Sequence, residues 1–333
     1  PDILALVEIE TENVVKQENV QKMVRQQSES LYEDYAKMRA QQVSDVTYNL
    51  QVTLDNTSES FAGVTDLTFE LAANNQNDLT IDFDSGTVNG VKVNGKAVSF
   101  IYEKWFITVP ANELSAGKNT VTVDYQRPYA TDGSGLHRFI DPENGEVYLY
   151  TDFEPYDANR LFPHFDQPDL KAKYTMQVTA PSTWQVISAA RENNIEEQGE
   201  NKRWHFPQTA KFSSYVFSLH AGNYAVWEDD FEGMKLRLFA RQSLAEYVKT
   251  EEWFKPTKQS FKFFNDYFEV PYPFLKYDQI VAPDFNAGAM ENVASVTFNE
   301  GYISRGEKST RAKMGLANVI AHEMAHMWFG NLV

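Results

Sequence analysis

Residues 319–330 read Val-Ile-Ala-His-Glu-Met-Ala-His-Met-Trp-Phe-Gly and contain the pattern His-Glu-x-x-His. On a helix, side chains four positions apart lie on one face, so His322 and His326 can reach the same metal ion. Glu323 is offset from the pair, which suits a base acting on a metal-activated water rather than a third ligand. The pattern also fits an amphipathic helix with two polar surface histidines, so it needs support from the rest of the chain.

Composition limits the classes of protein that this chain can represent. A chain of 333 residues exceeds one ordinary domain, and its 42% apolar and 14% aromatic residues can form a large core. The net charge of −17 argues against nucleic acid or an anionic membrane surface as a partner. Because cysteine is missing, disulfides and thiolate metal sites are excluded. No apolar run is long enough for a transmembrane helix, so we expect a soluble protein, either cytoplasmic or periplasmic.

The first 45 residues form an N-terminal arm that contains a helix. Ser30-x-x-Glu33 has the form of a capping box, and apolar residues follow it at helical spacing, so we predict a helix over 31–42. Upstream of this helix, the sequence leaves a second helix and a loose arm both open.

Residues 46–228 have the pattern of an antiparallel β domain. Apolar and polar residues alternate from Tyr48 to Leu54, and similar runs recur as far as Trp227. Three dipeptides are typical of tight hairpin turns, in which both central residues take positive φ: Asn89-Gly90, Asn94-Gly95 and Asn144-Gly145. We therefore predict packed sheets of a sandwich or saddle-like form.

Residues 229–333 alternate between predicted strands and helices. Short strands are expected over 236–239, 279–282 and 293–298. A helix with a phenylalanine-rich face is expected over 243–268, and the last helix over 308–329, with Gly330 as its stop signal. This part is therefore a separate α+β domain.

A second motif supports the reading of the last helix as a metal site. Gly288-Ala289-Met290-Glu291-Asn292 precedes His-Glu-x-x-His, and this pairing resembles the M1 zinc aminopeptidases, which are gluzincins related to aminopeptidase N. The resemblance extends to residues 150–155, 159–163, 165–168 and 328–333, and covers roughly residues 46–333. It implies a mainly β N-terminal domain followed by the first, α+β half of a thermolysin-like catalytic domain.

The resemblance also assigns roles to individual residues. His322 and His326 would bind one Zn²⁺, and Glu323 would be the general base that deprotonates the zinc-activated water. Glu291, together with Glu154 from the β domain, would bind the free α-ammonium of a peptide substrate. Gly288 and Ala289 would let the substrate backbone approach closely, and Met290 and Asn292 would complete the substrate-binding motif. Asp152 stands where many relatives carry Gln, which leaves the preferred first residue of the substrate open.

In such enzymes the third zinc ligand is a Glu about nineteen residues after the second histidine, and a catalytic Tyr follows it. The remainder of a parent polypeptide is therefore expected to complete the site, and the 333-residue chain is expected to be inactive alone. Two alternatives stay open. One is an endopeptidase or epoxide hydrolase on the same scaffold, and the other is a non-catalytic fragment that binds peptide or a partner.

Overall fold

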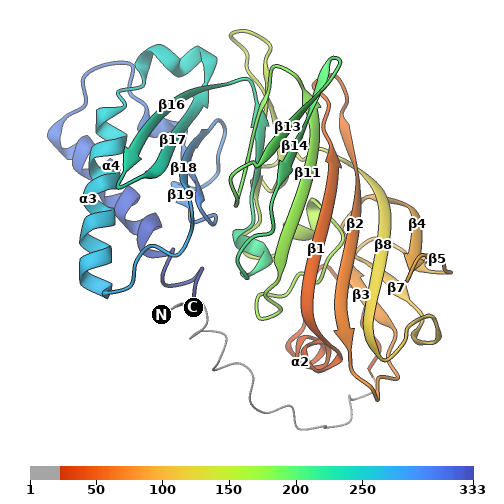
Figure 1. Ribbon diagram of the computed structural model, residues 1–333. Helices are drawn as coiled ribbons and strands as arrows, with labels where there is room; N and C mark the ends of the chain where they lie inside the picture. Colours follow the sequence, from red (N-terminus) through yellow and green to blue (C-terminus); the bar gives the residue numbers. More distant parts are fainter. Residues whose placement is uncertain (1–22) are drawn as a thin grey trace.

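The computed structural model describes residues 23–333, and its β-rich half is built on an 8-stranded sheet (Figure 1). Apolar and polar residues alternate along its central strands, so every second side chain is buried. Across the sheet the order is β13 (Asn194–Gln198), β14 (Asn201–Phe206), β11 (Lys173–Pro181), β1 (Val43–Thr53), β2 (Ser60–Leu71), β8 (Gly117–Pro128), β4 (Thr87–Val93) and β5 (Lys96–Ala97). All neighbours are antiparallel except β1 and β11, which run parallel with Thr47 opposite Lys173.

Two smaller sheets contribute to the same core as the large sheet. A 3-stranded sheet has the order β3 (Leu79–Asp82), β7 (Phe106–Val109) and β6 (Ile101–Tyr102). A 4-stranded sheet has the order β12 (Gln185–Ser188), β15 (Leu219–Gly222), β10 (Val147–Asp152) and β9 (Gly135–Ile140). Leu50 of the large sheet, Ile107 of β7 and Leu149 of β10 belong to one buried cluster. The mainly antiparallel β domain expected from the sequence is confirmed.

The other half is a 5-stranded sheet with two helices packed against it (Figure 1). The strand order is β16 (Tyr224–Phe231), β17 (Met234–Arg241), β18 (Tyr277–Ala282), β20 (Ser295–Asn299) and β19 (Ala289–Met290). The helices are α3 (Glu251–Phe268) and α4 (Thr310–Ala325), and they bury Phe261 and Ile320 in a common core with Leu238. β16 begins inside the range 46–228, yet it pairs with β17 along its whole length.

Both predicted helices in this half are shorter than the sequence pattern suggested. The helix expected from residue 243 begins at Glu251, because Val248 is extended and separates it from the 3₁₀ segment η4 (Gln242–Tyr247). The helix expected over 308–329 is capped by the Ser309 hydroxyl, which accepts from the Ala312 amide, and it ends at Ala325. Beyond that point, i to i+3 bonds such as Met327 N to Met324 O (3.0 Å) tighten the chain. The other 3₁₀ segments are η1 (Ala111–Glu113), η2 (Ala158–Arg160), η3 (Ser214–Val216) and η5 (Glu300–Tyr302).

The N-terminal helix is present as α2 (Glu33–Gln42), close to the predicted 31–42. The predicted capping box is wrong, because Tyr32 is the N-cap and makes no side-chain capping bond. α2 turns the side chains of Tyr35, Met38 and Arg39 inward. Residues 1–22, where the sequence left a second helix and an arm both open, lie outside the described residues.

The three Asn-Gly dipeptides have different structures. Asn94-Gly95 forms the β4–β5 hairpin with φ of 50° and 82°, as predicted. Asn89-Gly90 is not a turn, because it lies inside β4, where the pairing with β8 contains a bulge between Val88 and Gly90. Asn144-Gly145 lies in a longer turn in which, of the two residues, Gly145 takes positive φ (76°).

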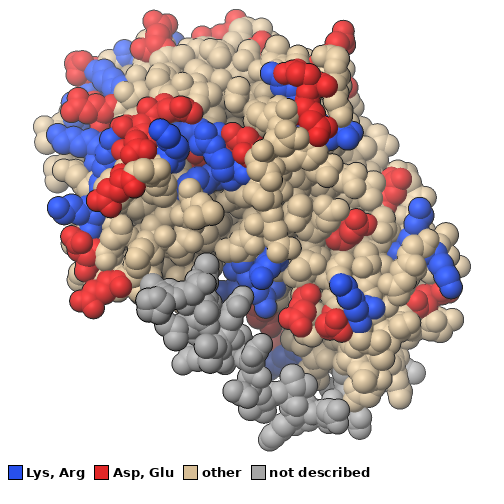
Figure 2. All heavy atoms as spheres, in the orientation of Figure 1, with Lys and Arg blue, Asp and Glu red and all other residues tan. Residues whose placement is uncertain are grey.

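The surface carries both signs of charge close together. Over the half that contains α3 and α4, Lys and Arg side chains lie among Asp and Glu (Figure 2). Within residues 23–333, no helix combines the length and the apolar composition that a membrane span needs.

Candidate metal centre and substrate site

The last two turns of α4 position the two histidines. The helix buries Leu316, Ile320 and Met324 in the core, which fixes its rotation about its own axis. His322 and His326 then project one turn apart, with their Nε2 atoms 3.3 Å apart. The predicted pairing of the two imidazoles is therefore present.

A backbone carbonyl orients the ring of His326. Its Nδ1 lies 3.2 Å from the carbonyl oxygen of Phe329, which accepts a hydrogen bond when Nδ1 carries the proton. In this tautomer Nε2 keeps its lone pair and faces His322. Tetrahedral zinc with Zn–N bonds of about 2.0–2.1 Å needs two ligand nitrogens about 3.4 Å apart, so the two imidazoles fit a zinc ion.

Two carboxylates lie close to His326. Glu323 is buried, with 4% of its surface exposed, and Glu291 Oε1 lies 4.0 Å from His326 Nδ1. Within residues 23–333, ligand atoms of Glu291, Glu323 and His326 lie within 4.8 Å of one another, and such a group could hold a metal ion. His322 is outside this cluster and joins it through its contact with His326.

Glu323 lies in a strongly acidic environment. Burial, with the negative charges of Glu291 and Glu154 as further causes, raises the pKa of its carboxyl to about 8. The carboxylates of Glu291, in the segment after β19, and of Glu154, in the segment after β10, therefore both act on the carboxyl of Glu323 in α4. Such a cluster is unfavourable unless a cation lies among its members.

The segment that carries Glu291 is held from behind by buried polar contacts. The Asn292 side chain accepts a bond of 2.7 Å from the Thr297 hydroxyl, which in turn lies 2.9 Å from Nε2 of the buried His220. The Glu291 carbonyl accepts a 2.8 Å bond from Asn331 Nδ2. Met290 is buried in the core of the β domain. The side chains of Met290 and Asn292 thus support Glu291 from the interior.

The other end of this segment faces outward. Gly288 is exposed and Ala289 is half-buried. The Gly288 carbonyl oxygen accepts a 2.9 Å hydrogen bond from the Asn299 amide, and a Cβ at Gly288 would lie 3.2 Å from the Tyr302 hydroxyl. This end therefore leaves an open strip of backbone beside Glu291.

Glu154 reaches the same region from the β domain. It follows β10, and its side chain is exposed while its neighbour Phe153 is fully buried. The structure therefore brings Glu154 to the group formed by Glu291 and Glu323, although it is 137 positions before Glu291 in the chain (291 − 154).

Two further residues complete the acidic site. Burial and the nearby charges of Glu154, Asp157 and Glu291 raise the pKa of Asp152 to about 6, although a hydrogen bond from the Glu154 amide opposes the shift. Burial also raises the pKa of Tyr215 in η3, with Glu291 and Glu154 as further causes. The sequence signalled Asp152 by its departure from the motif, but nothing in its spacing pointed to Tyr215.

Comparison with known proteins gives matches in both halves. Residues 44–216 match the family model described as the peptidase M1 N-terminal domain, and residues 253–333 match the peptidase family M1 domain. Aminopeptidase N of Streptomyces lividans is 38% identical over 312 residues, which are 91% of this chain and 36% of that protein. Probable M1 family aminopeptidase 1 of Encephalitozoon cuniculi is 34% identical over 266 residues, 75% of this chain and 30% of its own length. Aminopeptidase M1 of Arabidopsis thaliana is 28% identical over 302 residues, which are 86% of this chain and 34% of that protein. The chain thus spans about a third of the length of these relatives.

Proposed function

The chain belongs to peptidase family M1, and from this premise we propose that the full-length protein is a zinc-dependent aminopeptidase that hydrolyses the N-terminal residue from peptides. The observation that carries the proposal is the meeting of a paired-imidazole site on α4 with acidic side chains from both halves of the molecule.

His322 and His326 would hold the metal. Their Nε2 atoms are 3.3 Å apart, and the His326 ring is oriented by the Phe329 carbonyl. When bound there, zinc would polarise the scissile carbonyl and bring the pKa of a bound water near 7. Side chains of the protein would carry out the proton transfer and bind the substrate.

Glu323 would move the proton. Its carboxyl is buried beside His326, and it would act as the general base that takes a proton from the attacking water and returns it to the leaving amine. Its low exposure keeps bulk water from competing for that proton.

Glu291 and Glu154 would bind the α-ammonium group of the substrate. Both carboxylates act on Glu323 and on Tyr215, and a substrate ammonium placed beside them would offset their negative charge while forming charge-assisted hydrogen bonds. Gly288 and Ala289 would leave room for the substrate backbone next to this ammonium. A peptide with a blocked N-terminus lacks the cation and would lose this interaction.

A third zinc ligand would come from outside these 333 residues. Catalytic zinc sites hold three protein ligands, and this chain offers two imidazoles at zinc spacing. We propose that the remainder of the full-length polypeptide supplies the third ligand and a transition-state-stabilising Tyr, so that the 333-residue chain alone binds zinc weakly and turns over no peptide.

Product analysis tests the aminopeptidase proposal. The full-length protein is incubated with an unblocked decapeptide and with its N-acetylated twin, and the products are identified by mass spectrometry. We expect the unblocked peptide to lose single residues from its N-terminus and the acetylated peptide to persist. Internal cleavage of the acetylated peptide would replace this proposal by the endopeptidase reading.

A non-catalytic role in binding peptides is the second candidate for the 333-residue chain, and it is favoured by the two-imidazole donor set. Calorimetry with an unblocked peptide and an activity assay separate the two candidates. Binding without turnover in both the 333-residue chain and the full-length protein would favour the binding role. Turnover by the full-length protein would confine the binding role to the isolated 333-residue chain.

A further inference from the structure

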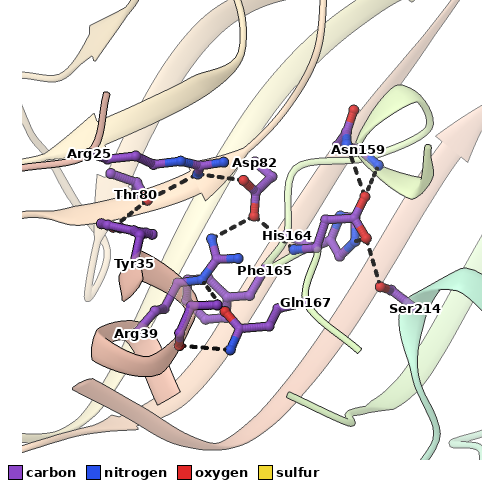
Figure 3. A network of polar contacts seen from close by, with 12 residues as sticks. Arg25, Tyr35, Arg39, Thr80, Asp82, Asn159, His164, Phe165, Gln167 and Ser214 are labelled. Carbon is purple, nitrogen blue, oxygen red and sulfur yellow. Dashed lines mark hydrogen bonds and ion pairs between the residues drawn. The ribbon is translucent and has the colours of Figure 1, made fainter. Parts of the chain in front are cut away.

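A fully buried carboxylate, Asp82 in β3, is paired with two arginines from the N-terminal part of the chain (Figure 3). Arg25 Nη1 lies 2.5 Å from its Oδ1, and Arg39 Nη1 lies 2.6 Å from its Oδ2. Both guanidinium groups are themselves buried, and Arg25 also stacks over Phe106, with 4.3 Å from its Cζ to the ring centroid. The charges hold the pKa of Asp82 well below its usual range although burial opposes this.

This ion cluster contacts the segment that carries Glu154. The Tyr156 hydroxyl donates to Asp82 Oδ1 at 2.9 Å and accepts from Arg25 Nη2 at 3.0 Å. Tyr156 lies two residues after Glu154, and only Pro155 separates them. The exposed Glu154 is therefore held on one side by β10 and on the other by Tyr156.

The far end of the same segment is tied to Asp82 as well. The Asp166 amide donates to Asp82 Oδ2 at 2.8 Å, and the backbones of Asp82 and His164 form an isolated bridge. The Asp166 carboxylate then accepts from the Ser214 hydroxyl at 2.9 Å, next to Tyr215 of the substrate site. Residues 153–166 thus form a loop that Asp82 fixes near both ends.

The arginines come from outside the part of the chain that matches the family models. The match begins at residue 44, whereas Arg25 and Arg39 precede it. Removing either cation would leave the buried Asp82 carboxylate with one cation instead of two, and this would weaken the contact that holds the loop. Arg25 and Arg39 are therefore connected, through Asp82 and Tyr156, to the segment that carries Glu154.

We propose that Arg25 and Arg39 are positioning residues for substrate recognition, which act through Asp82 and the Tyr156 hydroxyl to hold Glu154 where it meets the substrate ammonium. This inference rests on the proposed aminopeptidase function. Arg25 and Arg39 then contribute, through these contacts, to the binding of the substrate amine. A displacement of about 1 Å at such a carboxylate is enough to weaken recognition by an order of magnitude or more.

The test compares Tyr156→Phe with Tyr129→Phe in the full-length protein. Each change removes a half-buried hydroxyl that makes two hydrogen bonds, but the Tyr129 hydroxyl bonds to the backbone of Asp55 instead. With an unblocked aminoacyl amide, Tyr156→Phe is expected to raise KM about tenfold with kcat within about twofold, and Tyr129→Phe to leave both unchanged. Arg25→Gln should raise KM similarly, and Arg25→Lys should restore part of the loss because it keeps the cation.

The outcomes separate the two proposals. If the wild-type protein hydrolyses the N-acetylated substrate as fast as the unblocked one, the proposed function fails. The positioning role is overturned if the wild type prefers the unblocked substrate but both variants, Tyr156→Phe and Arg25→Gln, have the same KM as the wild type. If Arg25→Gln fails to fold, Tyr156→Phe decides alone. An equal rise of KM in Tyr129→Phe would also overturn it, because loss of any buried hydroxyl would then suffice.

Discussion

The Nε2 atoms of His322 and His326 face each other at 3.3 Å at the end of α4, the spacing that two ligands of one tetrahedral zinc require. The core contacts of α4 set the rotation of the helix, and the Phe329 carbonyl sets the ring of His326. The end of α4 thus already has the spacing of ligand nitrogens that a zinc ion would need.

Replacement of His326 by Ala is expected to lower the zinc affinity of the full-length protein by at least about 100-fold, because one of the few ligands is lost. Competition with a fluorescent zinc chelator measures the change. His205→Gln is the control, since His205 lies far along the chain in β14 and pairs with Glu196. Equal zinc affinity in the wild type and His326→Ala would contradict the assignment of this ligand.

Glu323→Gln is expected to lower kcat by about 10³-fold or more while zinc stays bound, because the amide keeps the shape of the side chain but cannot accept the proton. Steady-state kinetics and elemental analysis of the same sample give the two quantities. Loss of zinc together with activity would instead identify Glu323 as a metal ligand.

Asp82→Asn is expected to lower the free energy of unfolding by about 3 kcal/mol, since it leaves two buried guanidinium groups without their carboxylate. Urea denaturation followed by tryptophan fluorescence measures it. Glu33→Gln removes an exposed ion pair with Lys37 and should give no measurable change. A stability of Asp82→Asn equal to that of Glu33→Gln would show that the cluster contributes little.

The raised pKa of Asp152, about 6 against an ordinary value of 3.8, predicts a dependence of stability on pH. Between these values the folded chain holds more protons than the unfolded chain, so the contribution of Asp152 to stability falls as pH rises from about 4 to 6. In metal-free protein, the wild type should lose stability relative to Asp152→Asn over this window. A constant difference between the two denaturation midpoints would be the contrary result.

Local sequence patterns predicted the elements that depend on local chemistry. The spacing of His322 and His326 requires only a helix, and the alternation in β1 and β2 requires only one buried face. The Asn94-Gly95 turn is likewise set by its own backbone. The pairing of Glu291 and Glu154 came from the resemblance, because no local rule connects positions so far apart.

Features that depend on distant contacts could not be predicted in this way. The parallel pairing of β1 with β11 joins Thr47 to Lys173, and it is visible only in the folded chain. Asn89-Gly90 satisfies a turn rule locally, but the register with β8 places it in a bulge. The partner of Arg25 is Asp82, 57 positions away (82 − 25), so this ion pair could not be predicted from the composition of the residues around Arg25.

The most direct test of the central claim is the ratio of kcat/KM for an unblocked aminoacyl amide to that for its N-acetylated twin, measured in the full-length wild type and in Glu291→Gln. The proposed aminopeptidase function predicts a large ratio in the wild type, because Glu291 and Glu154 would bind the ammonium, and a fall of about 100-fold in Glu291→Gln. Equal kcat/KM for the two substrates in the wild type would contradict it.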